Sequence, residues 1–295
     1  MPAVDTPYII GVIRTFEKRL LQADEYTRII EADSATQAAN QLLETPYGPW
    51  LTPGAGAEMA LKAVEERLSD LMNWIAEHVV DDEVAAFLQT RYDGLNMASG
   101  LMEWATGKQE PGRFSQLGSI RPEALHSTIW HDVGWEELPE EWESFGRALR
   151  KELDTEERAE NWKYQLLEQT AKQQFLIERS LAKTELMVRL AQLHEARWRT
   201  DRFIRGEGPL PTSRQEQRAY PTFSSDAPDY ERAWDNLVLD TVRAAQYEVI
   251  GYDPIIAFWY AVEIEAKTIR LLLTGKTQSL PTDQVREMVR NTYRP

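Results

Sequence analysis

Apolar residues recur at intervals of three and four positions along most of this chain, which is the period of an amphipathic α-helix. The first such stripe runs from Tyr8 to Leu20. Further segments with the same period are predicted to be helical: 57–80, 84–105, 162–181, 186–204, 230–249 and 253–275. No segment shows a convincing apolar–polar alternation, and no Asn-Gly or Asp-Gly pair joins two such segments as a hairpin. The pattern therefore predicts an all-α fold.

One segment near the C-terminus reads as a complete helix with its own start and stop signals. Asp253 is the predicted N-cap, because its carboxylate can accept the free N–H groups of the first turn. Pro254 fits the first helical position, where no N–H is needed, and Gly275 suits a left-handed residue that ends the helix. The apolar stripe of this helix consists of Ile255, Phe258, Trp259, Val262, Ala266, Ile269, Leu272 and Leu273.

The same helix carries a second, charged face formed by Glu263, Lys267 and Arg270. Glu263 lies four residues before Lys267, which is the order that stabilises a helix best. At about 1.5 Å per residue, the helix is expected to be about 30 Å long.

The chain also repeats itself weakly. Segment 82–87 resembles segment 253–258, and each of the two long helices ends in Thr-Gly-Lys, at 106–108 and at 274–276. A short predicted helix follows each, while the middle copy, 184–205, lacks both the cap and the closing tripeptide. Chance similarity among amphipathic helices is common, but the shared order of these features favours a degenerate repeat.

Composition narrows the class of protein. Hydrophobic residues make up 42% of the 295, enough for a sizeable core, yet no run approaches the roughly 18 apolar residues that cross a bilayer. The first residues lack the basic and apolar segments of a secretory signal. Cysteine is absent, which removes disulfides, thiol catalysis and cysteine metal sites. A cytoplasmic protein is the simplest inference.

The formal net charge of −15 points to the kind of partner. It argues against nucleic-acid binding, which needs clustered Lys and Arg, and against direct contact with anionic lipid. A protein of this charge that works near a membrane has to sit on another protein, through a basic or apolar surface. Solubility alone is an equally good explanation of the charge.

No motif predicts catalysis or a bound cofactor. Gly54-Ala55-Gly56 lacks the third glycine and the preceding strand of a dinucleotide loop, and Gly275-Lys276 lacks the earlier glycine of a P-loop. The histidines have no metal-binding spacing and are expected to be exposed or at helix ends: His78, His126, His131 and His194. Acidic clusters at 81–83 and 156–157 are interpreted as helix starts, where the dipole favours them.

Three local features have two readings each. Segment 135–143, rich in Trp and Glu, is either a contact for a basic partner or a helix start with its tryptophans turned inward, which we favour. Arg14 and Arg19 either face a partner or, as we prefer, pair with carboxylates of neighbouring helices such as Glu263 or Glu265. Gly94, inside a predicted helix, marks either a close helix contact or a bend. The longest polar, proline-rich loop, 206–228, is expected to be mobile.

Motifs at both ends of the chain resemble the C/d subunit family of the vacuolar/archaeal-type rotary ATPases. The C-terminal ones are Gly-Tyr-Asp-Pro-Ile-Ile-Ala at 251–257, Glu-Ile-Glu-Ala-Lys-Thr-Ile-Arg at 263–270 and Gly-Lys at 275–276. The N-terminal ones are Tyr-Ile-Ile-Gly-Val-Ile-Arg at 8–14, Lys-Arg-Leu-Leu at 18–21, Glu25-Tyr26 and Thr-Pro-Tyr-Gly at 45–48. The positions carried over as structural or partner contacts are Tyr8, Arg14, Arg19, Tyr252, Asp253, Pro254, Glu263, Glu265, Lys267 and Arg270.

The resemblance implies a fold and a role. The fold is a funnel of three related helical units around a pseudo-threefold axis, expected at 1–110, 111–222 and 223–295 within one continuous structure. The role is non-catalytic, with no metal, cofactor or bound nucleotide. Such a protein joins the central rotor shaft of the ATPase head to the membrane proteolipid ring, lies at the cytoplasmic membrane face, and serves proton or sodium transport.

Two alternatives remain at this point. The first is a free-standing acidic helical scaffold or regulator that binds a basic protein. An enzyme with acids and histidines assembled from distant helices ranks third, and a deep pocket with coupled titratable groups would favour it.

Overall fold

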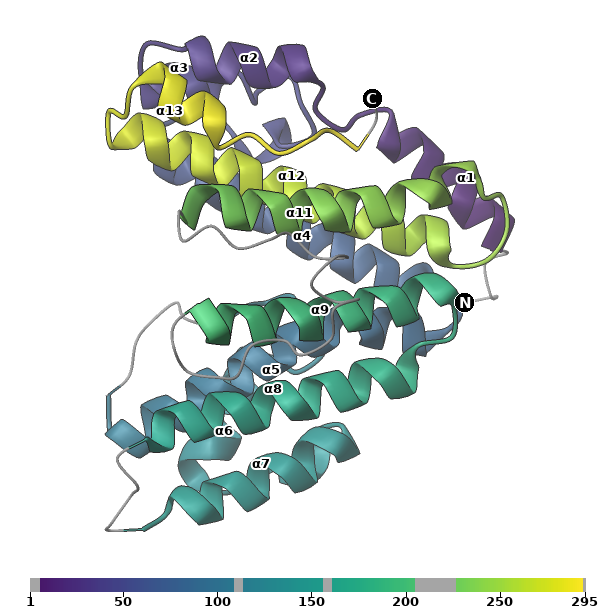
Figure 1. Ribbon diagram of the computed structural model, residues 1–295, viewed down its shortest axis with the longest axis vertical. Coiled ribbons are helices and arrows are strands. Elements are labelled where there is room, and N and C mark those ends of the chain that lie inside the picture. The colour runs from purple at the N-terminus through teal and green to yellow at the C-terminus, as the bar shows by residue number, and fades with distance from the viewer. Residues whose placement is uncertain (1–5, 109–113, 156–160, 205–226, 294–295) are drawn as a thin grey trace. The chain divides into compact units, whose positions relative to one another are not determined.

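The computed structural model describes residues 6–108, 114–155, 161–204 and 227–293, and every regular element within these ranges is a helix (Figure 1). The predicted all-α fold is confirmed. The chain divides into two compact units, residues 1–80 with 184–295, and residues 81–183. These boundaries follow contacts rather than sequence repeats, so the division into three repeated units stays a prediction.

The larger unit is built around one long buried helix, α12 (Asp253–Thr277). The other described elements of this unit are α1 (Thr6–Glu17), α2 (Ala23–Glu31), α3 (Ala35–Asn40), η1 (Gly48–Trp50), α4 (Ala57–His78), α9 (Glu185–Ile204), α11 (Ala227–Arg243), η3 (Ala244–Tyr247) and α13 (Thr282–Glu287). Helix α12 contacts α4 and α11 most extensively, and Figure 1 shows α11 running alongside it. The whole predicted apolar stripe of α12 is buried, so this helix is the core of the unit.

Both predicted ends of α12 need correction. The N-cap is Tyr252, and Asp253 is already the first helical residue, so Pro254 takes the second position. Gly275 lies within the helix rather than after it, and the left-handed residue is Ser279. Gly275 faces α13 instead, because a Cβ there would lie 3.2 Å from Val285. The 25-residue helix is about 37 Å long.

In the smaller unit, the described residues form four α-helices around a core of their own. They are α5 (Asp82–Thr106), α6 (Pro122–His131), α7 (Glu140–Leu153) and α8 (Trp162–Leu181), with η2 (Trp135–Glu137) before α7. The predicted acidic helix start is confirmed at Asp81, which accepts a hydrogen bond from the Glu83 N–H. Gly107, with a φ of 66°, ends α5 in the left-handed conformation.

Two of the open readings are resolved in this unit. Trp135 and Trp142 are buried in its core, so the Trp- and Glu-rich segment is a helix start with inward-facing tryptophans. A Cβ on Gly94 would lie 3.1 Å from the Gln174 amide and 3.3 Å from Trp142, so Gly94 marks a close contact of α5 with α7 and α8.

Helix α5 carries a buried acid, Asp93, that binds the segment before α6. Asp93 accepts hydrogen bonds from the Ser119 hydroxyl at 2.7 Å and from the Ile120 N–H at 3.0 Å. Burial raises the pKa of Asp93 to about 6, although these hydrogen bonds oppose the shift.

Some element predictions are wrong or lie outside the described residues. The helix expected to reach residue 249 ends at Arg243 and is followed by η3. The expectation that the histidines are exposed or at helix ends is wrong for His126 and His194, which are half-buried inside α6 and α9. The proposed mobile loop at 206–228 and the acidic pair at 156–157 fall largely or wholly outside the described residues.

Candidate interaction site

The most exposed apolar side chains described in the larger unit lie between α11 and α12. Tyr247, Val249 and Ile250 are 85%, 71% and 72% exposed. The segment that carries them is followed by Gly251, whose φ of 83° suits a residue without a side chain. Contiguous apolar residues this exposed are typical of a surface that contacts another molecule.

Arg14 of α1 holds this segment in place. Its guanidinium donates hydrogen bonds to the Ala245 carbonyl at 2.9 Å and to the Glu248 carbonyl at 2.6 Å, and it pairs with Glu17 at 2.6 Å. The Tyr293 hydroxyl donates to the same Glu17 carboxylate at 3.4 Å. The exposed residues are therefore supported by α1 and by the C-terminal segment.

Acidic groups border the apolar residues. Partial burial and the carboxylate of Asp253 raise the pKa of Glu248, while Arg14 opposes the shift. Burial also raises the pKa of Asp253, with a further contribution from Glu185, against a hydrogen bond from Thr184. An apolar patch with acidic neighbours favours a partner surface whose apolar centre is flanked by basic residues. We call residues 247–250 with this border the α12 entry surface.

A second group of predicted residues meets in the core. Glu265 is 5% exposed. Its carboxylate accepts hydrogen bonds from the Leu21 N–H at 2.6 Å and from the Tyr47 hydroxyl at 2.8 Å. Burial raises its pKa to about 7, against the opposing effects of Arg67 and of both hydrogen bonds. Glu265 is thus a buried junction rather than a partner contact.

A third group forms a buried ionic network around Asp235 of α11. The Asp235 carboxylate binds Arg290 at 2.9 Å, Lys267 at 2.8 Å and Arg197 at 3.2 Å. Lys267 also approaches Glu231 at 3.5 Å. Four segments of the larger unit are joined here, so Lys267 has a structural role.

The remaining predicted residues are dispersed. Tyr8 is exposed on α1 and Arg19 is exposed just after it, while Arg270 shares a half-buried face of α12 with Glu263. The expectation that Arg14 and Arg19 pair with carboxylates of neighbouring helices such as Glu263 or Glu265 is wrong. Arg14 pairs with Glu17 on its own helix, and Arg19 makes no ion pair within the described residues.

Sequence reasoning missed the residues whose partners are distant in the chain. Asp235 and Arg290 appear in no motif, and no local pattern marks a buried ion pair across 55 positions. Glu17 was missed although a local signal exists, because it lies three residues after Arg14 on the same helix. The exposed segment had one available signal. Val249 and Ile250 precede a glycine and a helix-starting proline, which argues for a turn rather than a continued helix.

Nothing in the described ranges forms a group of three or more His, Cys, Asp or Glu residues arranged to hold a metal ion. Within the same ranges, no helix is long and apolar enough to cross a membrane. The geometry supports a partner-binding role for the α12 entry surface and a stabilising role for Glu265 and the Asp235 network.

Known proteins match this chain over nearly its whole length, which includes the motifs at both of its ends. The family described as "ATP synthase (C/AC39) subunit" matches residues 9–192 and 208–288. A curated relative, the C subunit of the V-type sodium ATPase of Enterococcus hirae, is 22% identical over 325 aligned positions, which cover 96% of this chain and 97% of the relative.

Proposed function

Because the chain belongs to the family of ATP synthase C/AC39 subunits, we propose that it is the non-catalytic central-stalk subunit of a V/A-type rotary ATPase. In this role it joins the rotor shaft of the soluble head to the membrane proteolipid ring. It passes rotation between ATP turnover and the movement of protons or sodium ions, and it lies peripherally at the inner membrane face through protein contacts.

The observation that carries the proposal is the family match at both ends and through the middle of the chain. The three-unit funnel around a pseudo-threefold axis is part of the same proposal. Long buried helices such as α12 supply the stiffness that a torque-transmitting part requires, because packed interiors resist deformation.

The α12 entry surface supports binding to another protein. Its exposed apolar residues are held by Arg14 rather than left free, so little conformational entropy is lost when a partner covers them. The net charge of −15 disfavours anionic lipid as that partner and favours a basic protein surface, such as the end of a shaft.

The test is recovery of the tagged chain from gently solubilised native membranes, followed by mass spectrometry of what it retains. Recovery of shaft, catalytic-head and proteolipid subunits together is the expected result. Recovery of the chain alone would contradict the coupling role and favour the acidic scaffold.

A further inference from the structure

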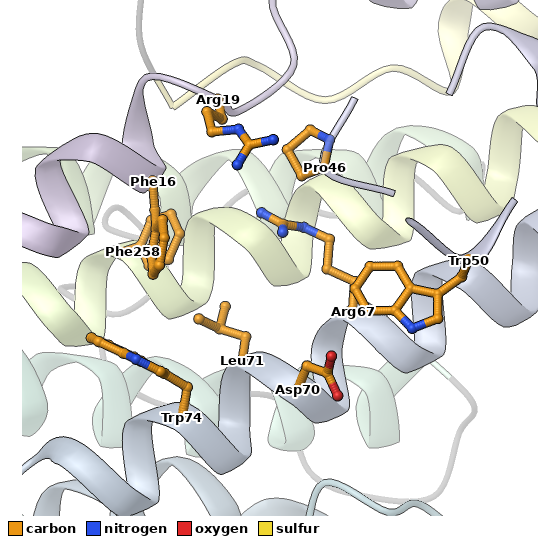
Figure 2. Close-up of a pocket in the computed structure, with 9 residues that line it drawn as sticks. All are labelled: Phe16, Arg19, Pro46, Trp50, Arg67, Asp70, Leu71, Trp74 and Phe258. Carbon is orange, nitrogen blue, oxygen red and sulfur yellow. The ribbon is translucent and has the colours of Figure 1, made fainter. Parts of the chain in front are cut away.

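A pocket of about 210 Å³ lies in the larger unit, apart from the α12 entry surface (Figure 2). It is formed by the end of α1, the turn around η1, one face of α4 and the first turns of α12. Its lining residues are Phe16, Arg19, Pro46, Trp50, Arg67, Asp70, Leu71, Trp74 and Phe258.

One side of the pocket is an aromatic wall. Phe16 meets Trp74 edge to face at 5.6 Å between ring centroids and lies 6.0 Å from Phe258. The Phe16–Trp74 pair has the edge-to-face geometry that aromatic pairs prefer, and the buried Phe258 lies behind it, so a further ring from a ligand can pack against Phe16 and Trp74.

The other functional element is a pair of arginines. Within the described residues, the side chains of Arg19 and Arg67 make no hydrogen bond and no ion pair, and the Arg67 Nε is buried without a hydrogen-bond partner. In Figure 2 both guanidinium groups extend toward the pocket, with Asp70 on the opposite side beside Trp50.

Arg67 has hydrogen-bonding capacity to spare. Glu265, the buried acid whose pKa Arg67 lowers, already accepts hydrogen bonds on both carboxylate oxygens, from the Leu21 N–H and the Tyr47 hydroxyl. The Arg67 guanidinium packs over the Tyr47 ring at 5.2 Å instead. A buried N–H without an acceptor, such as the Arg67 Nε, is costly, and a carboxylate is the acceptor that the planar guanidinium fork matches best.

We infer that this pocket binds a peptide segment of a partner protein in which a carboxylate lies beside an aromatic side chain. The ring packs against Phe16 and Trp74, which the buried Phe258 supports from behind, and the carboxylate is bound by Arg67 and Arg19. Asp70 is placed to accept a backbone N–H of the same segment. The pocket is lined by two cationic groups and one carboxylate, although the whole chain has a net charge of −15. The pocket of this acidic protein therefore favours an acidic ligand.

The carboxylate has two sources, an acidic side chain within the segment or a free C-terminus. Three short probes separate them: acetyl-Ala-Phe-Asp-Ala-amide, its Asn counterpart, and acetyl-Ala-Phe with a free carboxyl group. Binding to the isolated full chain is followed by NMR of the tryptophan indole N–H groups, and Trp74→Phe identifies the Trp74 signal. The measurement is independent of the coupling function, because no other ATPase component is present.

The Asp peptide, the free acid or both are expected to bind about tenfold more tightly than the Asn peptide, since a desolvated charge-assisted contact is worth about one tenfold step. Whichever acid binds identifies the source. Arg67→Gln is expected to remove the preference, while Lys62→Gln, a neighbour on the same helix that does not line the pocket, keeps it.

Arg19→Gln tests the pocket without disturbing the core, because Arg19 is exposed, and it is expected to weaken the acidic probe about threefold. Equal binding of the Asp and Asn peptides with no preference for the free acid, or unchanged selectivity in both arginine variants, would overturn the inference. Absence of any shift at Trp74 with either acid would do the same.

Discussion

The Tyr47 hydroxyl donates a 2.8 Å hydrogen bond to Glu265, which lies 218 positions later in the chain. The Leu21 N–H binds the other oxygen of the same carboxylate at 2.6 Å. Leu21, Tyr47 and Glu265 come from three separate motifs, and each motif contributes one residue to this buried site. These motif positions therefore maintain the larger unit rather than contact a partner.

Glu265 is expected to make stability depend on pH. Its pKa of about 7 in the folded state lies above the ordinary value of about 4.3 for an unfolded chain. The stability tied to its protonated form is fully present below about pH 4 and is lost as the pH rises through 7.

Glu265→Gln removes this contribution. The free energy of unfolding is measured with urea for both proteins at pH 5 and at pH 8. The difference between the variant and the natural protein should shift by about 2–3 kcal/mol in favour of the variant from pH 5 to pH 8. Comparison of the two proteins cancels the titration of the other carboxylates. A constant difference in unfolding free energy at both pH values would show that Glu265 does not titrate in this window.

Tyr47→Phe leaves one Glu265 oxygen buried without its donor. The free energy of unfolding at pH 8 is expected to fall by about 1–3 kcal/mol, since an unsatisfied buried acceptor loses its full solvation. Tyr8→Phe is the matched control, because Tyr8 is 64% exposed, and it should change stability by less than about 0.5 kcal/mol. Similar effects of both substitutions would contradict the assigned hydrogen bond.

Asp235→Asn tests the ionic network. Arg290 is 5% exposed and loses the charge that compensates it, so we expect a loss of about 3 kcal/mol or more in urea unfolding. Asp24→Asn breaks an exposed pair with Arg28 and should cost about 0–1 kcal/mol. Equal costs for the two substitutions would mean that the Asp235 network is not a stabilising junction.

Gly146→Ala and Gly11→Ala are expected to act in opposite directions. A Cβ on Gly146 would lie 2.6 Å from Trp135 and 2.9 Å from Met97, so overpacking should lower the melting temperature despite the better helix propensity of alanine. A Cβ on Gly11 meets nothing within 4 Å, so the second variant should gain up to about 1 kcal/mol. Calorimetry on both proteins checks the opposite signs.

The α12 entry surface makes a separate prediction about assembly. The double change Val249→Ser with Ile250→Ser should leave the melting temperature unchanged, because both side chains are more than 70% exposed, yet reduce recovery of ATPase subunits with the tagged chain. Val133→Ser, at a 56% exposed position in the smaller unit, is the control. Full recovery with the double variant would exclude this surface as a contact.

Helical periodicity predicted the fold well because it is a local property. Residues 162–181 form α8 as expected, and the α12 stripe is buried throughout. Helix ends were less accurate: Gly275 is a typical end signal but lies inside α12, at a position where a Cβ would approach Val285. The carbonyl partners of Arg14 and the partners of Asp235 and Glu265 could not be predicted, since each of these contacts joins segments that only the folded chain brings together.

The central claim is that this chain couples the two parts of a rotary ATPase. The most direct measurement is ATP-driven ion uptake into membrane vesicles from cells that lack the chain, before and after addition of the purified protein, with ATP hydrolysis followed in parallel. The account predicts that the chain restores uptake and the attachment of the catalytic head to the membrane. Uptake and head attachment that are complete without the chain, and unchanged when it is added, would contradict the coupling role.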